Sequence, residues 1–220
     1  MKRLVCFLLF FVLLAQTTPA QNTKPAFSKE IDTFKLADRQ QMPAANAILL
    51  AGSSSFTKWT DVQEYFPGYP ILNRGFGGSS LPDLIRYAGD IIIPYRPRQV
   101  IVYCGENDIA TDTVTAAMVE QRFRELFLLI RSQMPGVPIA FISIKPSPSR
   151  WKYEPIILEA NRLIQIFLKK QTHAQYIDIH NAMLQTNGTV NESLFVQDKL
   201  HMNEKGYQIW QKIMTPVLVK

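Results

Sequence analysis

The sequence predicts an α/β fold with three layers, in which helices cover both faces of a central parallel sheet. From residue 47 onward, short apolar runs alternate with longer amphipathic segments, the order expected when parallel strands are joined by crossover helices. Most of the short runs are apolar throughout, which is typical of strands covered on both faces. Both observations indicate a single α/β domain built around one sheet.

Five of the short runs are predicted to be strands. They are Ala47–Ala51, Pro70–Asn73, Gln99–Cys104, Pro138–Ser143 and Gln175–Ile179. Helices are predicted at 56–66, 80–92, 113–134, 152–171 and 203–215. The third helix is the clearest, because its apolar residues recur at helical spacing and form one stripe. Ligands bind beyond the carboxyl ends of the strands in such sheets, so the loops that follow the strands are where function is expected.

The N-terminus has the pattern of a secretory signal peptide. Lys2 and Arg3 precede a wholly apolar run from Leu4 to Ala15, and cleavage is predicted near Ala20, so residues 1–20 form the signal. The run is shorter than the roughly 20 apolar residues that cross a bilayer. We therefore expect an exported protein, periplasmic or secreted, without an integral membrane segment after cleavage.

The rest of the chain divides into two parts. Residues 21–46 are mostly polar and are predicted to be an N-terminal leader segment, with a short helix near Glu30–Lys35. Residues 47–220 are predicted to be the α/β domain, which starts where the alternation of strands and helices begins.

Composition and cysteine usage exclude several classes of protein. The 10 glycines, 14 prolines and 11% aromatic residues, without a low-complexity tract, exclude collagen, coiled coil and disorder. The basic residues are scattered, so nucleic-acid binding is not expected. Cys104 belongs to an apolar strand and is predicted to be an inert core residue. No cluster has the spacing of metal ligands, so neither a metal nor a cofactor is expected.

Four loops at strand ends carry the residue types of an acyl-transfer site. Their sequences are Gly52-Ser53-Ser54-Ser55, Asn73-Arg74-Gly75-Phe76-Gly77-Gly78-Ser79, Gly105-Glu106-Asn107-Asp108 and Asp198-Lys199-Leu200-His201. Together they supply a hydroxyl, small residues that expose backbone N–H groups, an amide donor and a carboxylate–imidazole pair.

Each of these groups has a predicted role. Ser54 is the candidate nucleophile, His201 the candidate base, and Asp198 would fix the tautomer of the imidazole. An oxyanion needs hydrogen-bond donors aimed at it, and the backbone N–H groups of Ser54 and Gly78 with the side chain of Asn107 are the candidates. Each residue also has a simpler interpretation: Ser54 as a turn or cap serine, Gly78 as a turn glycine, and Asn107 as a helix cap.

In their order and spacing, these four blocks resemble the SGNH (GDSL-type) hydrolases, named for Ser, Gly, Asn and His. The resemblance runs from about residue 47 to 210 and matches the nucleophile position to Ser54, the oxyanion positions to Gly78 and Asn107, and the last block to Asp198 and His201. It implies a three-layer, flavodoxin-like fold with a central five-stranded parallel sheet flanked by helices. It also implies ester hydrolysis through an acyl-serine, without a metal.

One position departs from the family pattern. The usual Asp before the nucleophile is Ser53 here, so that three consecutive serines leave the register open between Ser53, Ser54 and Ser55, with Ser54 preferred. Among the three histidines, His173 and His180 are rivals for the base, but only His201 has a carboxylate three residues earlier.

The leading hypothesis is an exported serine esterase that acts on small or glycan-linked acyl esters. The alternatives are a lysophospholipase or thioesterase of the same fold, and a catalytically silent binding protein, to which Ser53 in place of Asp points. Acyl-chain length and oligomeric state stay open at this stage.

Overall fold

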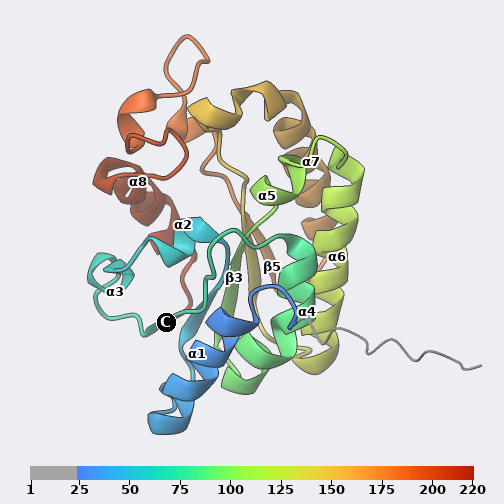
Figure 1. The fold of residues 1–220 in the computed structure, drawn as a ribbon, viewed down its shortest axis with the longest axis vertical. Helices are drawn as coiled ribbons and strands as arrows, with labels where there is room; N and C mark the ends of the chain where they lie inside the picture. Colours follow the sequence, from blue (N-terminus) through green and yellow to red (C-terminus); the bar gives the residue numbers. More distant parts are fainter. Residues whose placement is uncertain (1–23) are drawn as a thin grey trace, which may run out of the picture.

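The computed structural model describes residues 24–220, and the signal peptide predicted for residues 1–20 lies outside them (Figure 1). Its centre is one five-stranded sheet. The strands are β1 (Ile48–Gly52), β2 (Ile71–Asn73), β3 (Gln99–Tyr103), β4 (Ile139–Ile142) and β5 (Ala174–Ile177). All neighbouring strands are parallel, in the order β2-β1-β3-β4-β5. The α/β fold with a five-stranded parallel sheet flanked by helices, as expected from the sequence, is therefore confirmed.

Helices cover both faces of this sheet. On one face lie α4 (Leu81–Ile91), α6 (Ala116–Gln133) and α7 (Glu154–Leu168). On the other lie α2 (Ser54–Thr57), α3 (Val62–Tyr65) and α8 (Glu204–Met214). Alternate residues of β1 point to the two sides: Leu49 packs with the first group of helices, whereas Ile48 and Leu50 pack with the second. This is why the strands are apolar at every position.

The segment predicted to be a polar leader contains a longer helix than the sequence indicates. Helix α1 spans Ser28–Gln40 and packs on α4. Ile31 is its one fully buried apolar residue, so the hydrophobic pattern of the segment is weak. It is attached through Ile31 and Phe34, which pack against the core, and through two ion pairs: Asp38 binds Arg74 at 2.5 Å and Lys35 binds Asp90 at 2.9 Å.

The helix predicted at 56–66 is two short helices, α2 and α3. The chain turns between them at Trp59, whose ring is fully buried and stacks on Tyr207 of α8 with a centroid distance of 4.6 Å. Burial of this large ring against α8 stabilises the turn in place of a continuous helix. Within residues 24–220, no helix is long and apolar enough to cross a membrane.

Candidate active site

Three side chains from distant parts of the chain form one hydrogen-bonded series at the carboxyl end of β1. The Oγ of Ser54 lies 2.8 Å from Nε2 of His201. Nδ1 of the same imidazole lies 2.6 Å from Oδ2 of Asp198. A hydroxyl, an imidazole and a carboxylate in this order are the arrangement that activates a serine as a nucleophile. The structure thus brings together Ser54, His201 and Asp198, as the sequence predicts.

The backbone of the loop that contains Asp198 fixes the orientation of the Asp198 carboxylate toward the imidazole of His201. Its Oδ1 accepts the backbone N–H groups of Leu200 and His201, both at 2.9 Å, while Lys199 between them adopts a left-handed backbone with φ 56°. Desolvation alone would raise the pKa of Asp198, but the hydrogen bonds from the His201 ring and from these backbone groups outweigh it and hold the pKa below its ordinary value. The Asp198 carboxylate is therefore ionised at neutral pH.

The position of Ser54 follows from the end of β1. A side chain at Gly52 would collide with the carbonyl oxygen of Tyr103 on the neighbouring strand, so this position requires glycine. Ser53 then caps α2 from an extended backbone, and Ser54 is the first helical residue, partly exposed to solvent. The next serine, Ser55, is buried, with only 2% of its surface exposed.

Two of the three candidate oxyanion donors meet at the hydroxyl of Ser53. Nδ2 of Asn107 donates to Ser53 Oγ and to the backbone oxygen of Ser79, each at 2.9 Å. The backbone N–H of Ser54 also donates to Ser53 Oγ, at 2.5 Å. Gly78 has φ 84°, a left-handed backbone that favours glycine. In this structure, the hydroxyl of Ser53 accepts from two of the three groups that the sequence assigns to the oxyanion.

Arg150 orients the amide of Asn107, and the sequence analysis missed it. It belongs to the 3-10 helix η2 (Pro148–Tyr153), which follows β4. Its Nη2 donates to Oδ1 of Asn107 at 2.9 Å and its Nη1 donates to the backbone oxygen of Glu106 at 2.7 Å. Because Arg150 binds the amide oxygen, the NH2 of Asn107 faces Ser53 Oγ and the backbone oxygen of Ser79. Its position in the loop after β4 could have indicated it, because this is a strand end from which the sequence predicts no site residue.

A buried ion pair lies directly beneath this loop. Both carboxylate oxygens of Glu106 lie 2.7 Å from Nζ of Lys145, which is fully buried. The hydroxyl of Tyr103 donates to the same carboxylate at 3.0 Å. Burial by itself would raise the pKa of Glu106, but the charges of Lys145 and Arg150 lower it below its ordinary value, so the pair is ionic. It anchors the residue that precedes Asn107.

Lys145→Met is expected to destabilise the protein by about 3–5 kcal/mol, because it leaves the Glu106 carboxylate buried without its counter-charge. Chemical denaturation at pH 7 measures this change. The matched control is Lys152→Met, since Lys152 binds Asp112 at 3.2 Å with both side chains 66% exposed and should matter little. Equal denaturation midpoints for the two variants would contradict a structural role for the buried pair.

The rival histidines lie elsewhere. His180 is 3% exposed and its Nε2 lies 2.7 Å from Oε1 of Glu154, away from the Ser54 series. Asp178 does not hold its ring, because the carboxylate accepts the backbone N–H of His180 instead. His173 is exposed and directly precedes β5, at the amino end of the sheet. The thiol of Cys104 is buried, and burial raises its pKa well above the ordinary value, as expected of an inert core residue.

Asp108 connects the loop after β3 to two helices, because its carboxylate accepts the N–H of Leu81 in α4 at 3.0 Å and binds Arg122 in α6 at 2.8 Å. In the described part of the chain, no group of three or more histidine, cysteine or acidic side chains is arranged to hold a metal ion.

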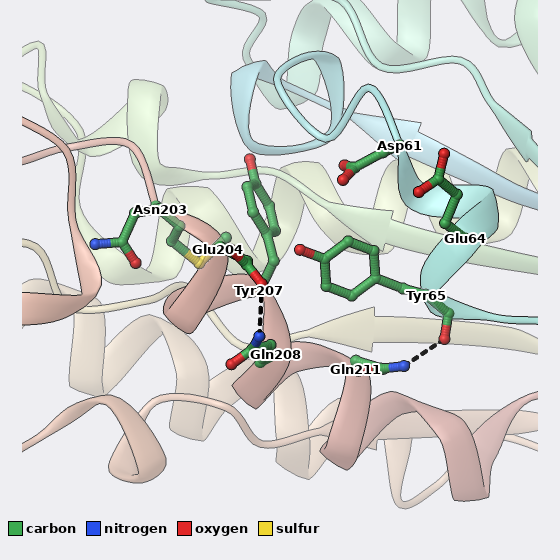
Figure 2. Close-up of a pocket in the computed structure, with 9 residues that line it drawn as sticks. Asp61, Glu64, Tyr65, Asn203, Glu204, Tyr207, Gln208 and Gln211 are labelled. Carbon is green, nitrogen blue, oxygen red and sulfur yellow. Dashed lines mark hydrogen bonds between the residues drawn. The ribbon is translucent and has the colours of Figure 1, made fainter.

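A cavity of about 460 Å³ lies between α3 and α8 (Figure 2). Three carboxylates line it, those of Asp61, Glu64 and Glu204, together with two tyrosines. One of these, Tyr207, closes the cavity toward α2, where its hydroxyl donates to the backbone oxygen of Ser55 at 2.9 Å. This cavity therefore lies against the side of α2 that carries Ser55, and Ser54 does not line it.

Residues 43–209 match the model of the GDSL-like Lipase/Acylhydrolase family, and this match covers most of the chain and all four loops. The chain therefore belongs to this family. No curated protein is significantly similar to it in sequence. The family supports hydrolysis of esters as the general class of activity.

Solved structures share the fold at low sequence identity. A protein of Streptococcus pneumonia named after platelet activating factor is 20% identical, with a TM-score of 0.75 over 87% of this chain and 92% of that one. A GDSL-like lipase from Bacteroides thetaiotaomicron is 15% identical, with a TM-score of 0.71 over 85% of this chain and 96% of that one. An acetyl-xylooligosaccharide esterase from Geobacillus Stearmophilus is 15% identical, with a TM-score of 0.63 over 80% of this chain and 96% of that one.

Proposed function

We propose that the protein is an exported serine esterase that hydrolyses small or glycan-linked carboxylic esters through an acyl-Ser54 intermediate. The observation that carries the proposal is the series Ser54 Oγ, His201 Nε2, His201 Nδ1 and Asp198 Oδ2, with separations of 2.8 and 2.6 Å at its two hydrogen bonds. The acetyl-xylooligosaccharide esterase among the structural neighbours supports carbohydrate esters as candidate substrates.

In the first half of the reaction, Ser54 Oγ attacks the ester carbonyl carbon while its proton passes to Nε2 of His201. The carbonyl oxygen becomes an oxyanion that accepts from the N–H groups of Ser54 and Gly78 and from the amide of Asn107. Collapse of this intermediate breaks the bond to the leaving alcohol, which takes the proton from His201. In the second half, water attacks the acyl-serine by the same route and releases the acid.

The hydroxyl of Ser53 must give way in this mechanism. It accepts from Ser54 N–H and from Asn107 in the absence of substrate, and the oxyanion replaces it as their acceptor. A serine hydroxyl can rotate to another staggered position at small cost. Ser53 in place of the family's Asp is thus compatible with catalysis, because its hydroxyl can leave these donors by rotating.

The test is a panel of p-nitrophenyl esters from two to sixteen carbons, with acetylated xylo-oligosaccharides and lysophospholipids beside them. Turnover of short esters supports the proposal. A preference for long acyl chains would favour the lysophospholipase or thioesterase alternative. No turnover of any ester, together with no labelling of Ser54 by a fluorophosphonate probe, would favour the silent binding protein.

The pH dependence of kcat/KM gives a separate expectation. The rate should rise with pH as His201 loses its proton and becomes able to accept that of Ser54. Protonation of Asp198 should not lower the rate between about pH 5 and 8. Its lowered pKa keeps the carboxylate ionised at every pH above the ordinary aspartate value of about 3.9, and its support of His201 is lost only below that value. A rate that is constant from about pH 5 to 8 would contradict a histidine base.

Arg150→Lys is expected to lower kcat about tenfold with little change in KM, since one ammonium cannot replace a guanidinium that binds Glu106 O and Asn107 Oδ1 together. Asn107→Ala should cost about 10²–10³ in kcat, the usual effect of removing an oxyanion donor. If Arg150 acts by orienting this amide, Arg150→Lys has no further effect in the Asn107→Ala protein. Additive losses in the double variant would contradict the positioning role.

A further inference from the structure

A second cavity lies on another side of Ser54, between α1 and the turn that follows β2. It has a volume of about 320 Å³. Phe34 on α1 and Phe76 in the turn contribute apolar rings to it, and Gly77 and Thr57 line it on the side of α2. This volume is near the lower end of the range of small-molecule sites, about 300–1,000 Å³. A small apolar group would fit such a space.

The cavity adjoins the candidate nucleophile across a glycine. A Cβ at Gly77 would lie 3.9 Å from Cβ of Ser54 and 4.0 Å from Oγ1 of Thr57. Ser54 and Thr57 are three residues apart in α2, so they lie on the same face of the helix. Because residue 77 has no side chain, nothing from this position separates the cavity from Ser54.

The position of His201 decides which half of an ester would enter. The leaving oxygen must lie within hydrogen-bond reach of Nε2 of His201, which supplies its proton. No residue of the loop from Asp198 to Asn203 lines the cavity, whereas Gly77, next to the oxyanion candidate Gly78, does. A group in the cavity would therefore lie on the oxyanion side of Ser54 and away from the leaving group, which is where the acyl chain belongs.

We propose that this cavity is the acyl subsite, that it takes short uncharged acyl chains, and that α1 forms its outer wall. The proposal rests on the proposed esterase function and adds the substrate class. Helix α1 (Ser28–Gln40) precedes residues 43–209, which match the family model. The carboxylate of Glu30 also lines the cavity and would disfavour acyl groups with a negative charge.

Contacts near both ends of α1 hold this wall against the rest of the domain. Asp38 near the end of α1 binds the guanidinium of Arg74 at 2.5 Å, and this guanidinium lies 4.9 Å from the centre of the Phe34 ring. Before the helix, the ring of Phe27 packs edge-on against Phe76 at 5.3 Å. Contacts at both ends of α1 therefore fix the distance between Phe34 and the turn.

The experiment compares kcat/KM for p-nitrophenyl esters of two, four, six and eight carbons in the full mature chain. Gly77→Val places a branched side chain between the cavity and Ser54, and we expect it to lower the ratio of hexanoate to acetate turnover about tenfold. Phe34→Ala removes the ring from the opposite wall, and we expect it to raise the same ratio about tenfold. Leu36→Ala is the matched control, because Leu36 lies on the same helix, is 57% exposed and does not line the cavity.

Opposite shifts of the ratio by the two variants support the subsite, because a general loss of stability would lower turnover of all esters together. Unchanged ratios in Gly77→Val and Phe34→Ala, with the wild type active, overturn the subsite and leave the esterase function standing. If the wild type turns over no ester in the panel, the esterase function fails, and the acyl subsite falls with it.

Discussion

Ser54→Ala is expected to lower kcat for p-nitrophenyl acetate by roughly 10⁴- to 10⁶-fold, the scale seen when a serine nucleophile is removed from a working triad. The physical reason is that Oγ of Ser54, 2.8 Å from Nε2 of His201, is the hydroxyl whose proton the imidazole can take. KM should change little, because the variant keeps the shape of the site. Steady-state kinetics together with labelling by a fluorophosphonate measures both effects.

The neighbouring serines provide matched controls. Ser55→Ala should keep most of the activity, since Ser55 is 2% exposed and cannot reach a substrate. Ser53→Ala should stay within about tenfold of the wild type, because the Ser53 hydroxyl only accepts hydrogen bonds from two groups that donate to the oxyanion in the proposed mechanism. Labelling that survives in Ser54→Ala and disappears in Ser53→Ala would contradict the assignment of the nucleophile.

Asp198→Asn is expected to lower kcat by about 10³- to 10⁴-fold with the fold intact. Oδ2 of Asp198, 2.6 Å from Nδ1 of His201, requires the proton on Nδ1 and so leaves Nε2 free to accept from Ser54. An amide at residue 198 can donate to Nδ1 through its NH2, which selects the wrong tautomer, and it cannot stabilise the imidazolium.

Asp178→Asn is the control for this prediction. Asp178 also lies in a loop next to a histidine, but its carboxylate binds the backbone N–H of His180, whose ring pairs with Glu154. Its replacement should leave kcat within a few-fold of the wild type. Equal losses in the two variants would mean that any nearby carboxylate supports the rate, and would contradict a specific role for Asp198.

Local sequence patterns predicted the strands well and the helices unevenly. All five predicted strands are present, with ends shifted by a residue or two, because runs of buried apolar residues are visible without knowledge of the fold. Helix α1 was underestimated, since one buried isoleucine makes no stripe and the ion pair between Asp38 and Arg74 joins residues 36 apart. The break between α2 and α3 depends on Trp59 meeting Tyr207, a contact that no local pattern contains.

The sequence could predict which loops carry the candidate site, but it could not predict which side chains in those loops contact one another. Ser54 and Asn107 could be singled out because each follows a strand end and carries a group that acyl transfer needs. His201 could be singled out because a carboxylate lies three residues before it. Arg150 and Lys145 could not, because each matters only through the atoms it binds: Oδ1 of Asn107 for the first and the carboxylate of Glu106 for the second. Nothing in an isolated arginine or lysine indicates such a partner.

By itself, the sequence determined the succession of strands and helices along the chain and the four loops that carry the candidate site residues. These depend on periodicity, and on the fact that parallel strands bring their carboxyl ends to a common edge. The tertiary structure decided which of three consecutive serines meets His201, which group orients Asn107, and what encloses the space beside Ser54. Those decisions depend on distances of about 3 Å between residues as far as 147 positions apart, and only the packed fold brings such residues together.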